Sequence, residues 1–110
     1  MDTLGHYREL VKQVIHAHAR QPLFGEVRVE TIFDETQDHY ELIHTGWEGL
    51  SRIEGAVIHV DIIDSKIWIQ HDGTEHGIAR ELETLGVPRT DIVLGFHSPA
   101  KRPHTGYAVA

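Results

Sequence analysis

The chain has 110 residues, no cysteine, and 10 Lys and Arg against 17 Asp and Glu, a formal charge of −7 at pH 7. This length fits one domain, and a hydrophobic content of 40% is that of a globular chain. The lack of cysteine excludes disulfides, Cys-ligated zinc and thiol catalysis, and it suits a reducing compartment. No segment reaches the ~20 apolar residues of a membrane span, and residues 1–10 lack the order of a signal peptide. We therefore expect a single cytoplasmic domain over residues 1–110.

The balance of charge makes nucleic acid an unfavourable direct partner. Duplex DNA draws most of its non-specific affinity from Lys and Arg contacts to phosphates, and here acidic residues outnumber basic ones. The chain also holds 10 histidines, which gain charge as the pH falls below their ordinary pKa of about 6.5. We therefore expect pH-dependent solubility and no direct binding of nucleic acid.

The first predicted element is a helix over residues 3–20. Its apolar side chains recur at spacings of three and four, which places them along one side of a helix. They are Leu4, Tyr7, Val11, Val14, Ile15 and His18. Asp2 or Thr3 is suited to cap the start, and Pro22 ends the helix because the residue before a proline avoids the helical conformation.

Four strands follow this helix. Residues 27–34 and 40–45 each show a period of two, in which largely apolar side chains alternate with largely polar ones, as in strands with one buried face. The polar segment 34–38 turns the chain between them. Two more strands are expected over residues 51–63 and 66–71. Strands joined by short turns pair antiparallel, so the sequence predicts an antiparallel sheet of about four strands.

The last two strands form the clearest hairpin. A two-residue loop at Asp64 and Ser65 sets the register, although it lacks the glycine that such turns prefer. Alternate residues then point to opposite faces of the sheet. The facing pairs include Asp61 with Trp68 and His59 with Gln70. The buried face is expected to hold Ile58, Val60, Ile62, Ile67 and Ile69, and the other face His59, Asp61, Trp68 and Gln70.

A second helix and a short C-terminal segment complete the chain. Asp72, with Glu75 three residues later, resembles a capping box, so a helix is expected to open there and run to about Leu85. Residues 91–96 form a short apolar run that fits either a helical turn or a strand, and residues 107–110 are expected to dock on the body. The predicted fold class is α+β, with the N-terminal helix packed on the sheet.

His59 and Asp61 lie at positions i and i+2 of a predicted strand and so share a face. Zinc sites often combine three such ligands with an open position, and His44 or His71 is the candidate third ligand. The register places His71 on the opposite face, however, and polar residues are ordinary on the wetter face of an antiparallel hairpin. We therefore expect no metal or other cofactor, with a metal-dependent enzyme centred on His59 and Asp61 kept as an alternative.

No catalytic motif stands out in the chain. The segment 71–76 concentrates titratable groups, but helix capping already accounts for Asp72 and Glu75. The glycines do not match phosphate-binding spacings, and there is neither a Gly-x-Ser-x-Gly nor a His-Glu-x-x-His sequence. We identify no catalytic residue and expect that the protein is not an enzyme.

One basic patch and two tryptophans are candidates for binding. Arg89, Lys101 and Arg102 could hold an anion, or belong to a solvated loop that offsets part of the acidic charge. If Trp47 and Trp68 lie on an outer face, their exposure to water is unfavourable in free energy unless the N-terminal helix, the C-terminal tail or another protein covers them. Exposed aromatic clusters with a polar rim are typical of interfaces. The partner-binding candidates are Trp47, His59, Asp61, Trp68 and Gln70.

Three segments carry a resemblance to a known family. They are residues 47–75, 85–99 and 102–110, and the most specific parts are Lys66–Gln70, Asp72–Glu75 and Asp91–His97. These segments are similar to the XisI family, the fdxN element excision controlling factor proteins. The similarity covers essentially the whole chain, and the N-terminal helix is its least diagnostic part.

The resemblance implies a small α+β domain found mainly in filamentous cyanobacteria. It implies that the founding member is required, with a companion called XisH, for a site-specific recombinase to excise a DNA element during heterocyst development. Many relatives lie beside an XisH-like gene. The resemblance carries over no catalytic residue.

The acidic charge favours contact with a DNA-acting protein over contact with DNA itself. We expect a small regulatory protein of programmed DNA element excision that binds an XisH-like partner and controls a site-specific recombinase. A homodimer is a further option, because an open sheet has edges that need cover. The alternatives are a direct DNA-binding factor that uses Arg89, Lys101 and Arg102, and the metal-dependent enzyme.

Overall fold

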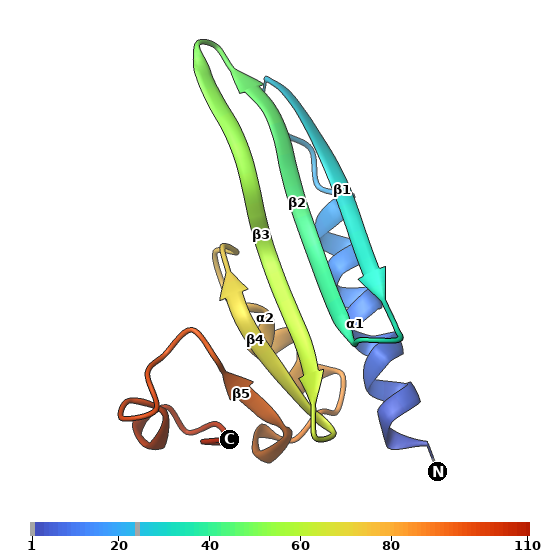
Figure 1. Cartoon of the computed structure of the whole chain (residues 1–110), viewed down its shortest axis with the longest axis vertical. Coiled ribbons are helices and arrows are strands. Elements are labelled where there is room, and N and C mark those ends of the chain that lie inside the picture. Colours follow the sequence, from blue (N-terminus) through green and yellow to red (C-terminus); the bar gives the residue numbers. More distant parts are fainter. Residues whose placement is uncertain (1, 24) are drawn as a thin grey trace.

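A sheet of five strands, in the order β1-β2-β3-β4-β5, packs its helices against one face (Figure 1). The structure is a computed structural model and describes residues 2–23 and 25–110. In chain order the elements are α1 (Thr3–Ala19), β1 (Glu26–Asp34), β2 (His39–Glu48), β3 (Ser51–Ile63), β4 (Lys66–Asp72), α2 (Ile78–Thr84), the 3-10 helix η1 (Arg89–Asp91), β5 (Ile92–Leu94) and the 3-10 helix η2 (Arg102–His104). Among the described residues, no helix has the length and apolar character needed to span a membrane. The predicted α+β class is confirmed.

The sheet has one strand more than the sequence predicted, and it is mixed. Strands β1 to β4 pair antiparallel, whereas β5 pairs parallel with β4. A parallel neighbour needs a crossover connection, and α2 supplies it. A three-residue strand is too short to show a period of two. The sequence of residues 91–96 was therefore compatible with either a helical turn or a strand. Residues 107–110 dock on the body as expected, because Ala108 forms a parallel bridge with Val93 of β5.

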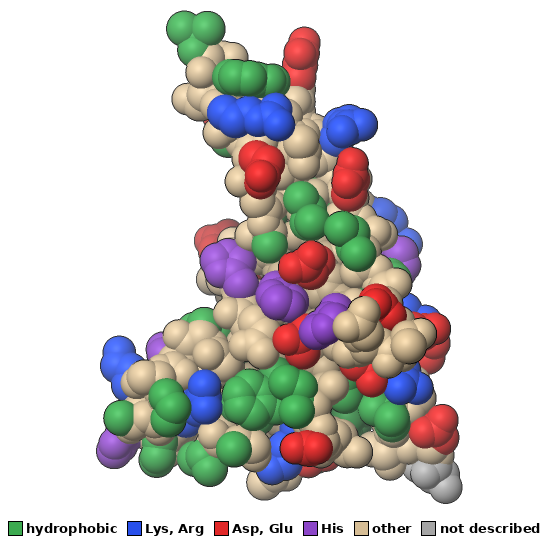
Figure 2. All heavy atoms as spheres, viewed as in Figure 1, with side chains coloured by type: hydrophobic (Ala, Val, Ile, Leu, Met, Phe, Trp, Pro, Cys, Tyr) green, Lys and Arg blue, Asp and Glu red, His purple; other side chains and the backbone are tan. Residues whose placement is uncertain are grey.

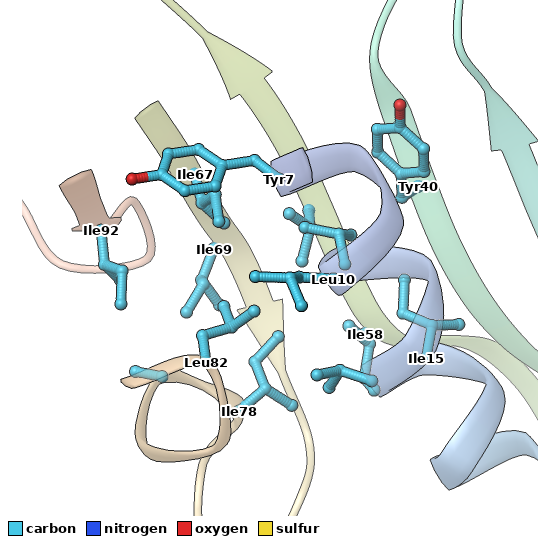
Figure 3. Close-up of a cluster of buried hydrophobic side chains, with 14 of the residues drawn as sticks. Tyr7, Leu10, Ile15, Tyr40, Ile58, Ile67, Ile69, Ile78, Leu82 and Ile92 are labelled. Carbon is cyan, nitrogen blue, oxygen red and sulfur yellow. The ribbon is translucent and has the colours of Figure 1, made fainter. Parts of the chain in front are cut away.

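One hydrophobic core fills the space between the helices and the covered face of the sheet. The side of α1 that faces the sheet buries Tyr7, Leu10, Val11, Val14 and Ile15. Figure 3 shows that side chains from α1, α2, β4 and β5 converge there. The hairpin residues predicted for the buried face all lie in this core: Ile58, Val60, Ile62, Ile67 and Ile69.

The β3–β4 hairpin turns at Asp64 and Ser65, whose φ angles are 51° and 63°. Positive φ at both central residues is the property of a type I′ turn, whose twist matches that of the strands. The facing of Asp61 and Trp68 is as predicted. The predicted pairing of His59 with Gln70 is wrong, because the register shifts at His59 and sets it opposite His71. An inserted bulge residue leaves no trace in the alternation of side chains.

The second helix begins later than predicted, at Ile78 instead of Asp72. Asp72 still caps it: its Oδ2 accepts a hydrogen bond from the Ile78 backbone N–H at 2.8 Å, and its Oδ1 accepts one from Thr74 at 2.9 Å. Gly77 just before the helix has φ 83°, a conformation that glycine adopts without steric cost. The prediction was therefore right that Asp72 binds the start of the helix, but the capping box itself was wrong, because Gly77 is the N-cap residue and a loop separates Asp72 from the helix.

Beyond the helices, β2 and β3 continue as a long projecting hairpin, and β1 pairs with β2 as far as Trp47 (Figure 1). We call residues 43–57 the distal hairpin. A register shift between Leu42 and Ile43 lies at its base, and β2 runs to Glu48, past the predicted end at residue 45. Within this described range no side chain is buried, so the core supports only the lower half of the hairpin.

Removal of a core side chain from the middle of the sheet should strongly destabilise the fold. Ile69 on β4 is fully buried, and truncation of such a residue to alanine costs about 2–5 kcal/mol of unfolding free energy. Chemical denaturation of Ile69→Ala measures this loss. The matched control is Ile63→Ala on the exposed end of β3, which should cost less than about 1 kcal/mol. A similar loss in the two variants would contradict the assigned register.

Glycine at the second turn residue should stabilise the protein. Ser65 holds a positive φ of 63°, which costs a non-glycine residue about 1 kcal/mol. Ser65→Gly should therefore raise the unfolding free energy by about 0.5–1 kcal/mol, as measured by urea denaturation. A loss of stability would mean that this turn is not of the primed type.

Candidate functional site

Strand pairing gathers most of the sequence-derived candidates on the face of the sheet opposite α1 and α2, which we call the outer face. Asp61 on β3 faces His39 on β2 and Trp68 on β4, and side chains that face each other across strands share a face. His59 lies two residues before Asp61 and therefore shares it too. Figure 2 shows this face, with histidines side by side across its middle.

Asp61 is the centre of a polar cluster on this face. It is the buried charged residue among those described, with 7% of its surface exposed. Its Oδ1 contacts Nδ1 of His39 at 2.6 Å and Nε2 of His59 at 3.0 Å, and its Oδ2 accepts a hydrogen bond from Nε2 of Gln70 at 3.2 Å. A buried carboxylate is tolerated only when its oxygens are satisfied in this way.

The cluster shifts the pKa values of its members. Burial raises the pKa of Asp61, but the hydrogen bond from His39, the charge of His59 and the Gln70 amide together outweigh burial and lower it. The pKa of His39 is raised, first by its hydrogen bond to Asp61 and then by the charge of that carboxylate. The result is a pair in which each charged form stabilises the other.

Three residues of the cluster bring potential metal ligands together. One atom each of His39, His59 and Asp61 lies within 4.8 Å of the other two. The sequence pointed to His44 or His71 as the third ligand, and the structure brings neither into this group. His39 was missed because only the pairing of β2 with β3 places it opposite Asp61. No spacing within one strand reveals such a contact.

Trp68 lies next to the polar cluster but is largely covered by the C-terminal segment. The guanidinium carbon of Arg102 lies 5.0 Å from the centre of the Trp68 ring, within the range of a cation–π contact. Gly95 packs so close that an added Cβ would lie 3.2 Å from Cε3 of Trp68. The observed cover comes from Gly95 and Arg102, which precede the apolar tail at residues 107–110 that the sequence offered as one possible cover.

Trp47 lies far from Trp68, near the tip of the distal hairpin. Eight residues of extended strand separate it from His39 at the start of β2, which is about 26 Å. The side chain of Trp47 is 48% exposed, and the guanidinium carbon of Arg52 lies 5.3 Å from its ring centre. Leu50 at the tip is fully exposed. The two tryptophans therefore share a face without forming one patch.

Two of the three predicted anion-binding residues already hold protein partners. Arg89 pairs through Nε with a carboxylate oxygen of Glu83, and its guanidinium lies over the ring of Tyr107 at 5.0 Å. Arg102 donates from Nε to the carbonyl oxygen of His97 at 3.1 Å, in addition to its contact with Trp68. Lys101, which precedes Arg102 in the chain, is exposed.

A separate groove of about 430 Å³ lies on the helix side of the sheet. It is lined by the end of α1, by β2 and β3 at the base of the distal hairpin, and by the loop before α2. His18 and Glu81 meet at its edge, with Nε2 and Oε2 2.7 Å apart, and His44 lines its wall. This groove was not predicted from the sequence, because four separate segments build it.

The contact between His39 and Asp61 should make stability depend on pH. Because the folded state raises the pKa of His39, the contact stabilises the fold below the unfolded value of about 6.5 and is lost as the pH rises through the folded value. His39→Gln should therefore destabilise the protein more at pH about 5.5 than at pH about 8.5. Chemical denaturation of both proteins at both pH values, with a chelator present, measures this. An equal loss at the two values would contradict the pairing.

Comparison with known proteins places the chain in a family. The XisI protein family model matches residues 1–109. The crystal structure of a XisI-like protein from Anabaena variabilis is 45% identical and superposes with a TM-score of 0.91, covering 97% of this chain and 99% of that one. The crystal structure of fdxN element excision controlling factor XisI from Anabaena variabilis is 37% identical, with a TM-score of 0.85 and coverage of 99% and 100%. No curated protein matches. The chain belongs to the XisI family.

Proposed function

We propose that this XisI-family protein is an accessory factor in the excision of a DNA element, and that it works by binding a protein. The relative described as an fdxN element excision controlling factor is 37% identical over nearly the whole of both chains, which supports a role in excision. The proposed partner is an XisH-like protein, through which this chain controls a site-specific recombinase. We place its action in binding and not in catalysis, and in the cytoplasm, where the DNA element lies.

The exposed tip of the distal hairpin is the observation that carries this proposal. Trp47 and Leu50 expose apolar surface there, and Arg52 stacks on the indole ring. Tryptophan and arginine are the residues most enriched among those that dominate binding energy at protein interfaces. The tip also projects away from the helices (Figure 1), so a partner reaches it without displacing any part of the core.

The charge of the protein supports a protein partner that itself acts on DNA. A protein that binds DNA presents a basic surface, and an acidic chain with a net charge of −7 complements such a surface and speeds its encounter. Arg89 and Arg102, which direct DNA binding would require, are engaged with Glu83 and Trp68. Both observations favour contact with the DNA-acting protein over contact with DNA.

Loss of the exposed tip should weaken partner binding without unfolding the protein. Trp47→Ala and Leu50→Ser should each weaken the affinity for the XisH-like protein of the same genome by about 10-fold or more. Isothermal titration calorimetry with purified proteins measures the affinity. The matched control is Phe96→Ala, since Phe96 is 49% exposed but lies in the C-terminal segment, and its affinity should stay within about 2-fold.

The same preparations separate the competing explanations. Unchanged affinity in both tip variants would remove the distal hairpin from the interface, and failure of the wild type to bind would remove the XisH-like protein as partner. A complex recovered from cells that disappears after nuclease treatment would favour the DNA-binding alternative. Light scattering of the free protein shows whether it binds as a monomer or as a homodimer formed through an uncovered sheet edge.

A further inference from the structure

Two imidazoles and one carboxylate from two neighbouring strands lie close together on the outer face. His39 begins β2, and His59 and Asp61 lie near the end of β3, opposite it. We propose that His39, His59 and Asp61 form a binding site for one divalent first-row transition-metal ion, of which Zn²⁺ is the test case. This inference rests on local geometry and does not depend on the excision role.

The distances between the ligand atoms suit such an ion. Bonds of about 2.0–2.1 Å from zinc to nitrogen or oxygen in a tetrahedral site place ligand atoms about 3.4 Å apart. Here Oδ1 of Asp61 lies 2.6 Å from Nδ1 of His39 and 3.0 Å from Nε2 of His59, and one potential ligand atom from each of the three residues lies within 4.8 Å of the other two. Adjustments of about an ångström, within reach of small side-chain rotations, bring the three atoms to bonding positions.

The groups around the three ligands are those that support a metal site. A histidine ligand usually donates its other ring N–H to a carboxylate. Oε1 of Glu41 lies 3.8 Å from Nδ1 of His59, outside hydrogen-bond range but close enough for a small side-chain rotation to form that bond. Gln70 donates a hydrogen bond to Oδ2 of Asp61, which fixes the carboxylate and leaves Oδ1 turned toward the two imidazoles. Glu41 faces His59 directly on the neighbouring strand, so sheet pairing holds this support in place.

The ligand types decide which ions the site prefers. Two imidazoles and one carboxylate suit Zn²⁺ and its first-row neighbours, whereas Ca²⁺ and Mg²⁺ prefer oxygen ligands throughout. His39 is half exposed, so solvent and ions reach the cluster from outside. Three protein ligands leave the fourth tetrahedral position open toward that side, where water or another molecule completes the coordination.

The scaffold is also suited to hold an ion. Ligands on strands are positioned more accurately than ligands on loops, and β2 and β3 pair without interruption at His39 and Asp61. Asp61 is buried against its neighbours, so its carboxylate has little freedom to turn away. The ion would replace the hydrogen bonds that now join Asp61 to the two histidines, and the strand framework would stay unchanged.

The test is a Zn²⁺ titration of untagged, chelator-stripped protein by isothermal titration calorimetry. We expect one ion per chain for the wild type. Removal of a second-layer group typically lowers metal affinity by about 10- to 100-fold. We expect His39→Gln and His59→Gln, each of which removes a direct ligand, to lower the Zn²⁺ affinity by more than this. Glu41→Gln, which removes a second-layer group, should lower it by about 10-fold. Both histidines lie at least partly in solvent, so these variants keep the fold, and thermal unfolding verifies this.

The controls distinguish this site from the other histidines of the chain, which has 10 in all. His6→Gln changes an exposed histidine on α1 and should leave Zn²⁺ affinity unchanged. Absence of stoichiometric binding in the wild type overturns the proposal. So does binding that survives both His39→Gln and His59→Gln, because the ion then lies elsewhere. Ca²⁺ of equal affinity would overturn the assigned class of metal.

Discussion

The register between β2, β3 and β4 is the constraint on which the rest of this structure depends. Because side chains alternate along a strand, a slip of one residue would exchange the two faces of the sheet. The observed register sends Val60 and Ile69 into the core and sends Asp61 and Trp68 to the opposite side. The same pairing therefore sets both the hydrophobic core and the polar cluster. The primed turn at residues 64–65 holds this register at one end of the hairpin.

Asp61 restricts the pairing of the three strands further, because its buried carboxylate needs hydrogen-bond partners from all of them. A buried carboxylate without partners would cost several kcal/mol, and here its partners come from β2 through His39, from β3 through His59 and from β4 through Gln70. A slip of β2 or β4 by one residue would turn His39 or Gln70 to the other face and remove it from Asp61. The polar cluster thus selects the native pairing against slipped alternatives, while the isoleucines on the covered face supply most of the driving force.

The sequence predicted the elements well wherever a regular period ran long enough to read. The helix over residues 3–20, the third strand and the two faces of the last hairpin all follow from spacing alone. Three features of the structure could not be predicted from these periods. The bulge opposite His59 inserts one residue without altering composition, β5 is too short to show a pattern, and His39 joins Asp61 only through contact between strands. Each depends on tertiary pairing, which single-sequence periodicity does not encode. The resemblance of long segments to the XisI family supplied what the periods could not.

The projecting hairpin has a thermodynamic consequence for how the molecule behaves before it meets anything. No side chain of residues 43–57 is fully buried, and of these residues Val57 packs against the core. The strand pairing beyond Val57 therefore rests on partly exposed side chains and on backbone hydrogen bonds that compete with water. Such segments open locally at a small fraction of the free energy needed to unfold the whole domain. We therefore expect the free protein to open first at the tip beyond Trp47, where β1 no longer pairs with β2, while the sheet beneath α1 stays intact. A partner that binds the tip restricts this motion, and the lost conformational entropy lowers the affinity of the complex.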